Sequence, residues 1–189
     1  MRIKITTLLI VVVICLAGAS VFQLDAQSSG SLTSIYTDIA GSSCRTIFTH
    51  RESGATTQSC AGVAGYKLEV EDDDARMSIT VVAPNGKKSE LSYWGVITSS
   101  FSSLGNKAEW RVRKVKGKNV PVALIVRVNA NEDSSNPEKL TSYLAVAKIT
   151  PSRTCVTERI GPSAKANEEA RRAADRAADK QCLEDTRQE

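Results

Sequence analysis

The sequence predicts a mainly β protein of the α+β class, built as an antiparallel meander sheet or sandwich with one C-terminal helix packed on it. Three observations lead to this class. Apolar and polar residues alternate in several short segments, turn-forming residues recur about every ten residues, and an alanine-rich, charged segment closes the chain. Strands joined by short turns favour antiparallel pairing over a sheet in which strands and helices alternate.

The first strands are marked by alternation and by turn chemistry. Residues 45–49 form a short strand, and residues 66–71 alternate strictly, so Leu68 and Val70 share one face. The segment 83–87 contains Pro-Asn-Gly, in which proline presets its backbone angle and glycine can adopt the left-handed conformation. These features predict a hairpin early in the sheet.

The later strands are longer and more apolar. Residues 121–128 are almost continuously apolar, which is typical of a strand buried on both faces. Residues 108–114 alternate, and residues 140–149 and 154–160 form two further strands. We expect the Ser- and Gly-rich residues 95–107 to form a long ordered loop.

The last regular element is a helix over residues 167–182. Asn167 supplies the cap, and acidic residues follow it at the end of the helix where the dipole favours negative charge. Alanines recur at three- and four-residue spacing and form one face. We expect two ion pairs on the outer face, each between residues four positions apart: Glu168 with Arg172, and Arg171 with Asp175.

An export signal is predicted at the start of the chain. Arg2 and Lys4 precede an unbroken apolar run over residues 8–17, which suits a signal-peptide core and falls short of the ~18 residues of a membrane span. Cleavage would follow Ala19 or Ala26. The alternative is an uncleaved membrane anchor over residues 5–22, and export to the periplasm or the cell exterior is the favoured interpretation.

The predicted domain organisation follows from that signal. Its parts are a signal peptide (1–26), a flexible leader (27–33), a single disulfide-stabilised β-rich domain with the helix at its end (34–182) and a tail (183–189).

The cysteines fit an exported chain. Cys15 lies in the apolar run, and the remaining four are Cys44, Cys60, Cys155 and Cys182. Exported thiols usually form disulfides, and four cysteines allow three pairings. We favour the nearest neighbours, Cys44 with Cys60 and Cys155 with Cys182, and each bridge would stabilise the fold by roughly 3–3.5 kcal/mol through loop-closure entropy.

Element lengths support the second pairing. Six strand residues from Cys155 to Gly161 travel about 20 Å, and a helix from Glu168 to Cys182 returns about 21 Å. A helix that doubles back along the last strand would therefore bring the two cysteines together. A helix beginning at Ser163 would instead overshoot by about two turns.

Charge argues against a nucleic-acid partner. Without residues 1–26 the chain loses Arg2, Lys4 and Asp25, which leaves 23 basic residues (25 less 2) and 20 acidic residues (21 less 1), or +3. The tight basic cluster at residues 114–118 is interpreted as a solvated hairpin tip, because nucleic-acid binders concentrate basic charge over a surface.

Metal and cofactor sites are not predicted. The three aspartates at 72–74 lack the ligand spacing of a calcium loop, and a turn explains them better. The four cysteines include no Cys-x-x-Cys pair, and the only histidine, His50, has no ligand partner at helical or turn spacing. We therefore expect neither a metal nor a cofactor.

Several segments together carry a family resemblance. They are SIYTDIAGSSC (34–44), CAGVAGYKLEV (60–70), AEWRV (108–112), PVALIVRVN (121–129), LAVAKIT with CVTERI (144–160) and ANEEARRAAD (166–175). With these segments the chain resembles a family of small uncharacterised exported bacterial proteins. The resemblance implies secretion and a two-disulfide domain, and it implies no catalytic or binding residue.

The sequence favours a non-catalytic binding or structural module of the cell envelope. A hydrolase needs a nucleophile, a base and an orienting group, and neither a Gly-x-Ser-x-Gly elbow nor a phosphate-binding glycine loop is present. The alternatives are a secreted hydrolase and an inhibitor of an extracellular enzyme. The expected partner is an envelope or extracellular protein, with membrane contact only if the N-terminal segment stays uncleaved.

The candidate partner-binding residues are Trp94, Phe101 and Trp110, which lie in or beside the Ser-rich segment 95–107. Loops on a rigid sheet commonly carry recognition. The competing interpretation, that both tryptophans belong to the core, is favoured. A second candidate is an outward basic stripe of Arg111, Arg113 and Arg127, and solvated side chains on the outer face of a sheet are the favoured explanation for it.

Overall fold

The computed structural model describes residues 31–185 of the chain. The predicted signal segment, its two cleavage sites, most of the predicted leader and the last four residues lie outside the described residues. Thr33 already belongs to the first strand.

The described residues form ten strands, two α-helices and two 3-10 turns. In chain order these are β1 (Thr33–Asp38), η1 (Gly41–Ser43), β2 (Cys44–Thr49), β3 (Thr56–Ala61), β4 (Lys67–Asp73), β5 (Arg76–Val82), β6 (Lys88–Glu90), α1 (Tyr93–Val96), β7 (Ser102–Val115), β8 (Lys118–Ala130), β9 (Thr141–Ile149), β10 (Thr154–Ile160), α2 (Ala166–Asp175) and η2 (Ala177–Asp179).

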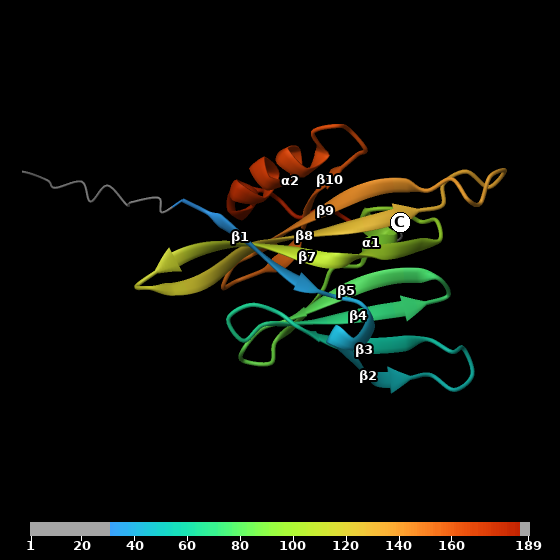
Figure 1. Cartoon of the computed structure of the whole chain (residues 1–189), viewed down its shortest axis with the longest axis horizontal. Helices are drawn as coiled ribbons and strands as arrows, with labels where there is room; N and C mark the ends of the chain where they lie inside the picture. Colours follow the sequence, from blue (N-terminus) through green and yellow to red (C-terminus); the bar gives the residue numbers. More distant parts are fainter. Residues whose placement is uncertain (1–30, 186–189) are drawn as a thin grey trace, which may run out of the picture.

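The strands form one open sheet made of two antiparallel meanders (Figure 1). The order is β10-β9-β8-β7-β5-β4-β3-β2, with β6 beside β5 and β1 beside β7. Strands β5 and β7 meet in parallel at a single pair, Arg76 with Ser102. Every other pairing is antiparallel. The narrow junction between β5 and β7 lets the two meanders turn toward each other.

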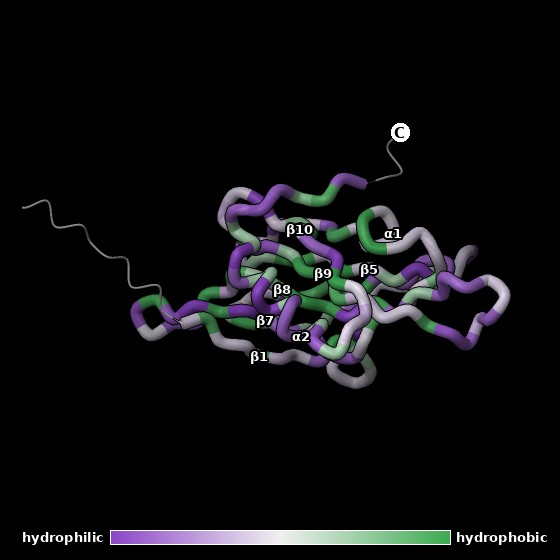
Figure 2. The backbone as a smooth tube through the Cα atoms, turned by 90° about the horizontal axis from the view of Figure 1, so that it is seen from above, coloured by the Kyte–Doolittle hydropathy of each residue, from purple (hydrophilic) through white to green (hydrophobic). Residues whose placement is uncertain are grey.

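The main core lies between the two meanders. Leu68 and Ile79 from β4 and β5 belong to the same buried cluster as Trp110 and Leu124 from β7 and β8. The ring centroids of Tyr66 and Trp110 lie 6.0 Å apart, which places the start of β4 against β7. Figure 2 shows that apolar residues gather along β7, β8 and β9 in the middle of the molecule.

A second, smaller core lies on the other face of β8 and β9. There Ile125 and Val146 pack against the alanine face of α2, represented by Ala170 and Ala174. Leu124, the neighbour of Ile125, points into the main core. The prediction that residues 121–128 are buried on both faces is therefore confirmed, and the molecule has three layers: α2, strands β7–β10, and strands β2–β6 (Figure 1).

The predicted fold class is confirmed in part. The protein is mainly β, with a C-terminal helix on the sheet, but the sheet is mixed because of the β5–β7 contact. The predicted loop over 95–107 is wrong. Helix α1 reaches Val96, and residues 102–107 already belong to β7. These residues have weak strand propensity, and pairing of Ser102, Ser103 and Leu104 with β8 and of Lys107 with β1 makes the segment a strand.

The C-terminal helix is shorter than the predicted 167–182. It ends at Asp175, and Arg176 leaves helical geometry before the short turn η2. Lys180 then has an extended backbone, so the chain reaches Cys182 as an extended segment and not as a helix. The favoured disulfides are nevertheless both present, Cys44–Cys60 and Cys155–Cys182.

Candidate functional site

The structure separates the three candidate partner-binding residues. Trp110 is fully buried, and its indole Nε1 donates a hydrogen bond to the Thr37 hydroxyl at 2.9 Å, so it holds β1 to β7 and is withdrawn as a binding residue. The core interpretation is confirmed for Trp110. It is wrong for Trp94, whose exposed fraction is 41%.

Phe101 is exposed at the turn before β7. The Arg76 guanidinium lies 4.6 Å from the centroid of the Phe101 ring, in cation–π geometry, and the Phe101 carbonyl accepts from the backbone N–H of Asn131. Phe101 is therefore a partly engaged side chain at the junction of β5, β7 and β8. It does not form one surface with Trp110.

The proposed basic stripe does not form. The guanidinium of Arg111 is buried against α2, and that of Arg127 donates to Ser142 and Asn167. Only Arg113 of the three is exposed to solvent without such partners among the described residues.

His50 is held in an exposed turn. Its Nδ1 accepts a hydrogen bond from the backbone N–H of Ser53 and lies 3.0 Å from the Ser53 hydroxyl. The hydroxyl oxygen in turn accepts from the N–H of Ala55. This pattern closes the loop between β2 and β3. It places a serine beside a histidine at the molecular surface, and within the described residues neither side chain forms a hydrogen bond with a carboxylate.

A half-buried ion network joins α2 to the sheet, and sequence reasoning missed it. Arg171 donates to the Glu109 carboxylate at 2.7 Å, and Arg111 makes a bidentate contact with Asp175 at 2.7 and 3.1 Å. Ser34 on β1 bridges Glu109 and Arg111. The predicted local pair of Arg171 with Asp175 is therefore wrong, because each residue pairs across to β7.

Electrostatics explain the choice of partners. Burial raises the pKa of the Glu109 carboxyl. Hydrogen bonds from Arg171 and Ser34 and the positive charge of Arg171 lower this pKa by more than burial raises it, so the net pKa lies below the usual 4.5. The hydrogen bond to Glu109 raises the pKa of Arg171. By contrast, the predicted pair of Glu168 and Arg172 does form, at 3.8 Å, and both side chains are exposed. The stronger cation–anion contacts are those that the sheet shields from water.

A hollow of the described residues lies beside the second disulfide. This C-terminal cleft has a volume of about 970 Å³. Its walls come from β6 and α1, from β9 and β10, and from the extended segment that follows η2; they are lined by Glu90, Leu91, Ser92, Val96, Lys148, Arg153, Cys155, Val156 and residues 180–185.

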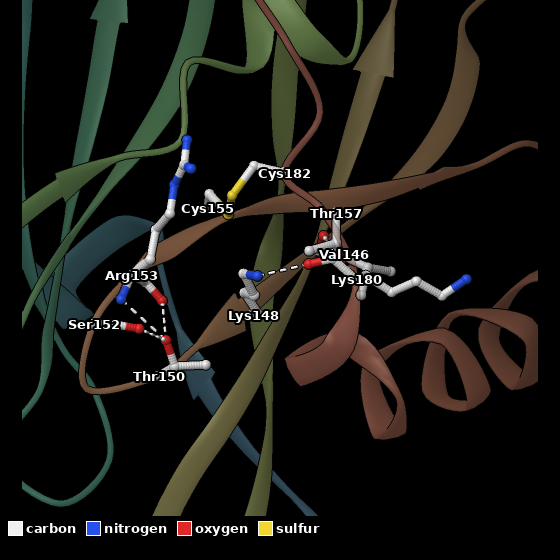
Figure 3. Close-up of a disulfide and its surroundings, with 9 residues drawn as sticks. All are labelled: Val146, Lys148, Thr150, Ser152, Arg153, Cys155, Thr157, Lys180 and Cys182. Carbon is white, nitrogen blue, oxygen red and sulfur yellow. Dashed lines mark hydrogen bonds between the residues drawn. A yellow bond between two sulfur atoms is a disulfide. The ribbon is translucent and has the colours of Figure 1, made fainter.

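The walls of the C-terminal cleft are fixed by bonds across it. The disulfide ties Cys182 to Cys155 on β10, and the backbone N–H of Leu183 donates to the Val156 carbonyl at 2.8 Å. Lys148 Nζ donates to the Lys180 carbonyl at 2.6 Å, and Figure 3 shows this contact near the disulfide. Three contacts thus hold the extended segment against β9 and β10.

The C-terminal cleft is polar and carries both charge signs. Lys148, Arg153 and Lys180 are its cations, and Glu90, Glu184 and Asp185 are its anions. Arg153 lies in the turn between β9 and β10, where its backbone N–H and carbonyl are both bonded by the Thr150 hydroxyl, which fixes the base of its long side chain (Figure 3). Such a lining suits a polar ligand with charges of both signs.

Trp94 lies next to the C-terminal cleft without lining it. Ser92 and Val96 line the cleft, and Trp94 is two positions from each. Residues two apart on a helix point to different sides. The exposed tryptophan therefore belongs to the surface beside the cleft.

The described residues contain no group of three or more histidine, cysteine, aspartate or glutamate side chains that could hold a metal ion. Within the same residues, no helix has the length and apolar character needed to cross a membrane. The two disulfides indicate an oxidising, extracytoplasmic environment.

Comparison of the chain with family models, with curated proteins and with solved structures found no match. The resemblance to exported bacterial proteins therefore gains no support from these comparisons, whereas the two disulfides that it implies are present.

Proposed function

We propose that the protein is a non-catalytic binding module that works outside the cytoplasm, in the periplasm or at the cell exterior. The observation that carries this proposal is the C-terminal cleft, whose volume of about 970 Å³ is that of a ligand site and whose walls are held by a disulfide. A cleft with fixed walls loses little conformational entropy when a partner enters it.

Binding is favoured over catalysis by the chemistry of the lining. Both cysteines of the cleft are oxidised, so neither is a thiolate nucleophile. Lys148 already donates to a backbone carbonyl. The serine and histidine that lie in contact, Ser53 and His50, belong to the β2–β3 turn and not to the cleft lining.

The charges of the C-terminal cleft define the expected partner. Three cations and three anions line it, so a polar segment of an envelope protein that carries both charge signs fits better than a uniformly anionic or apolar ligand. The surface around Trp94, beside the cleft, extends the contact area, because exposed tryptophans often anchor interfaces.

Site-specific photocrosslinking in living cells tests the proposal. A photoreactive amino acid replaces Gln181, an exposed residue of the cleft, and in a second strain it replaces Thr46, an exposed residue of β2. We expect a discrete covalent adduct from position 181 and none from position 46. Arg153→Glu should weaken the adduct at position 181, and Arg45→Glu, a charge reversal on β2, should leave it unchanged.

Two results would contradict the proposal. One is the same set of adducts from positions 181 and 46, and the other is an adduct at 181 that is insensitive to Arg153→Glu. Either result would mean that the cleft does not select a partner.

A further inference from the structure

The end of the β7–β8 hairpin carries a concentrated basic charge. Residues 110–131 contain six arginines and lysines and no aspartate or glutamate. Arg113, Lys114, Lys116 and Lys118 lie at the hairpin end, where residues 113–118 are all exposed. None of these four cations takes part in the ion pairs of the described residues. Figure 1 shows the hairpin projecting from the body of the molecule.

One face of the hairpin end combines cations with exposed valines. Arg113 is opposite Val120, and Val115 is opposite Lys118. Directly opposed residues share a face, and so do residues two apart on a strand. One face therefore presents two cations and two valines, whose exposed fractions are 45% for Val115 and 41% for Val120.

The tip places a lysine where the backbone disfavours it. Lys116 and Gly117 have φ values of 49° and 78°, which is the pattern of a two-residue type I′ turn. Asparagine or glycine is preferred at the first of these positions. Turn chemistry does not explain Lys116, and its position gives the hairpin a cation at its outermost point.

The described chain begins beside this hairpin. Thr33 pairs with Val112 at the hairpin base, and the Leu32 carbonyl accepts a hydrogen bond from Arg111. The sequence upstream contains the mostly apolar residues 5–22, and the eight residues 23–30 separate them from Ser31. Eight residues span at most about 28 Å. The start of β1 and the hairpin lie at the same end of the molecule in Figures 1 and 2.

We propose that the β7–β8 hairpin docks on a bilayer surface that contains anionic phospholipid. The cations would lie among the lipid headgroups, and Val115 and Val120 would enter the boundary of the acyl chains. A lipid surface fits better than a nucleic acid, because residues 111–120 contain no aromatic side chain on which bases could stack. Interleaved aliphatic and basic residues are typical of segments that lie at a membrane interface.

The first test measures binding of the exported protein to vesicles. The vesicles contain phosphatidylcholine with 30 mol% phosphatidylglycerol in one set and phosphatidylcholine alone in the other, a probe composition chosen to isolate surface charge. The hairpin variant is R113Q/K114Q/K116N/K118Q, in which Asn also suits the turn. Each cation near an anionic surface contributes about fivefold to partitioning, so this variant should lose at least about tenfold in binding to anionic vesicles.

A matched control separates the hairpin from net charge. The variant R45Q/R51Q/K67Q/K165Q removes the same number of exposed cations from other parts of the described surface. We expect it to bind anionic vesicles within about twofold of the unmodified protein, because these positions do not face the docked bilayer.

A second measurement reports on the hairpin itself and does not depend on whether the N-terminal segment is retained. The Val120→Cys side chain carries an environment-sensitive dye, in a chain that also has Cys15→Ser. The dye emission should shift to the blue with anionic vesicles and not with neutral vesicles, and the shift should fall as salt rises from 0.1 to 0.5 M.

The proposal is overturned by undiminished binding of the hairpin variant, by an equal loss in the control variant, or by a dye shift that is the same with both kinds of vesicle. A dye shift with RNA or with an anionic polysaccharide, but not with vesicles, would assign the hairpin to a different polyanion and would also overturn it.

Discussion

Tyr93 shows how a single polar atom can limit stability. The side chain is fully buried on α1, and its hydroxyl has no hydrogen-bond partner among the described residues. Burial also raises the pKa of the phenol well above its usual 10, so the group stays neutral. A buried hydroxyl without a partner retains the full cost of its desolvation.

We therefore expect Tyr93→Phe to increase the free energy of unfolding by about 1 kcal/mol. Tyr143→Phe is the matched control, because the Tyr143 hydroxyl donates to Glu132 at 2.8 Å near the surface and its loss should lower stability slightly. Urea denaturation followed by tryptophan fluorescence measures both. A destabilised Tyr93→Phe protein would show that the hydroxyl has a partner in solution.

Glu109 illustrates the opposite case, a buried charge with several partners. Arg171 and Ser34 both donate to its carboxylate, and only 10% of its side chain is exposed. Glu109→Gln keeps the shape of the side chain and removes its charge. This substitution should lower the free energy of unfolding by about 1–2 kcal/mol at pH 7. The expected loss is smaller than at a fully buried ion pair, because 38% of the Arg171 side chain is exposed to solvent.

The pH dependence has a definite sign. The pKa of Glu109 is lower in the folded protein than its usual 4.5, so this group stabilises the fold fully above pH 4.5 and loses that contribution as pH falls through the lowered pKa. The stability difference between the unmodified protein and Glu109→Gln should therefore shrink between pH 7 and pH 3. Glu168→Gln removes one charge of an exposed ion pair, so the free energy of unfolding of this variant should stay within about 0.5 kcal/mol of that of the unmodified protein over the same pH range. A difference for Glu109→Gln that stays constant with pH would contradict this account.

Residue patterns predicted some positions and missed others for physical reasons. Alternation around Trp110 correctly placed its side chain inward, because the side-chain period of a strand is local. The same alternation turned Glu109 and Arg111 outward, toward solvent. Their burial depends on α2, which begins more than fifty residues later in the chain and contributes Arg171 and Asp175. Local spacing does not encode that contact.

At the scale of the elements, the alanine face of α2 explains how a short helix holds its place. Four buried alanines let the helix backbone approach β8 and β9 closely, and the two partly buried arginine–carboxylate contacts fasten its outer edge to β7. The disulfide at Cys182 lies beyond the helix, after η2. It therefore restrains the extended segment more directly than the helix.

Hydrogen exchange can separate these two restraints. In the Cys155→Ser/Cys182→Ser double variant, the amide of Leu183, which donates to Val156, should exchange much faster, while amides of α2 keep most of their protection. Cys44→Ser/Cys60→Ser is the matched control and should accelerate exchange in β2 and β3 only, because these strands pair at the two cysteines. Loss of protection throughout α2 in the first variant would show that the helix depends on the disulfide.

Element boundaries were predictable where patterning was strong and failed where it was weak. The hydrophobic run of β8 predicted both its strand and its double burial. The Ser-rich segment before Lys107 carries no such pattern, and pairing of Ser102, Ser103 and Leu104 with β8 imposes its conformation. Helix α1 spans only four residues, fewer than any periodicity can mark.

At the scale of the whole molecule, two meanders meet at the single β5–β7 pair and enclose one core, with α2 on the far side of β8 and β9. On this arrangement we propose two interaction surfaces: the C-terminal cleft beside one disulfide, and the β7–β8 hairpin near the start of β1. They would let the protein hold a partner at the cleft while its hairpin rests on a bilayer.

Alternation and turns predicted the antiparallel meanders but not how they fold together. Whether the sheet stays flat, closes or turns over depends on the contact of Tyr66 with Trp110 and on the Arg76–Ser102 pair, which join residues far apart in the chain. The cleft was equally hidden, because its walls come from three separate parts of the sequence.

The C-terminal segment of this extracytoplasmic domain is held to β10 by the Cys155–Cys182 disulfide, on which the walls of the C-terminal cleft depend. The most direct measurement is peptide mapping of protein recovered from outside the cytoplasm, alkylated under denaturing conditions and digested without reduction. We expect two linked peptide pairs, Cys44 with Cys60 and Cys155 with Cys182. Alkylated Cys155 and Cys182, or a link between either of them and Cys44 or Cys60, would contradict it.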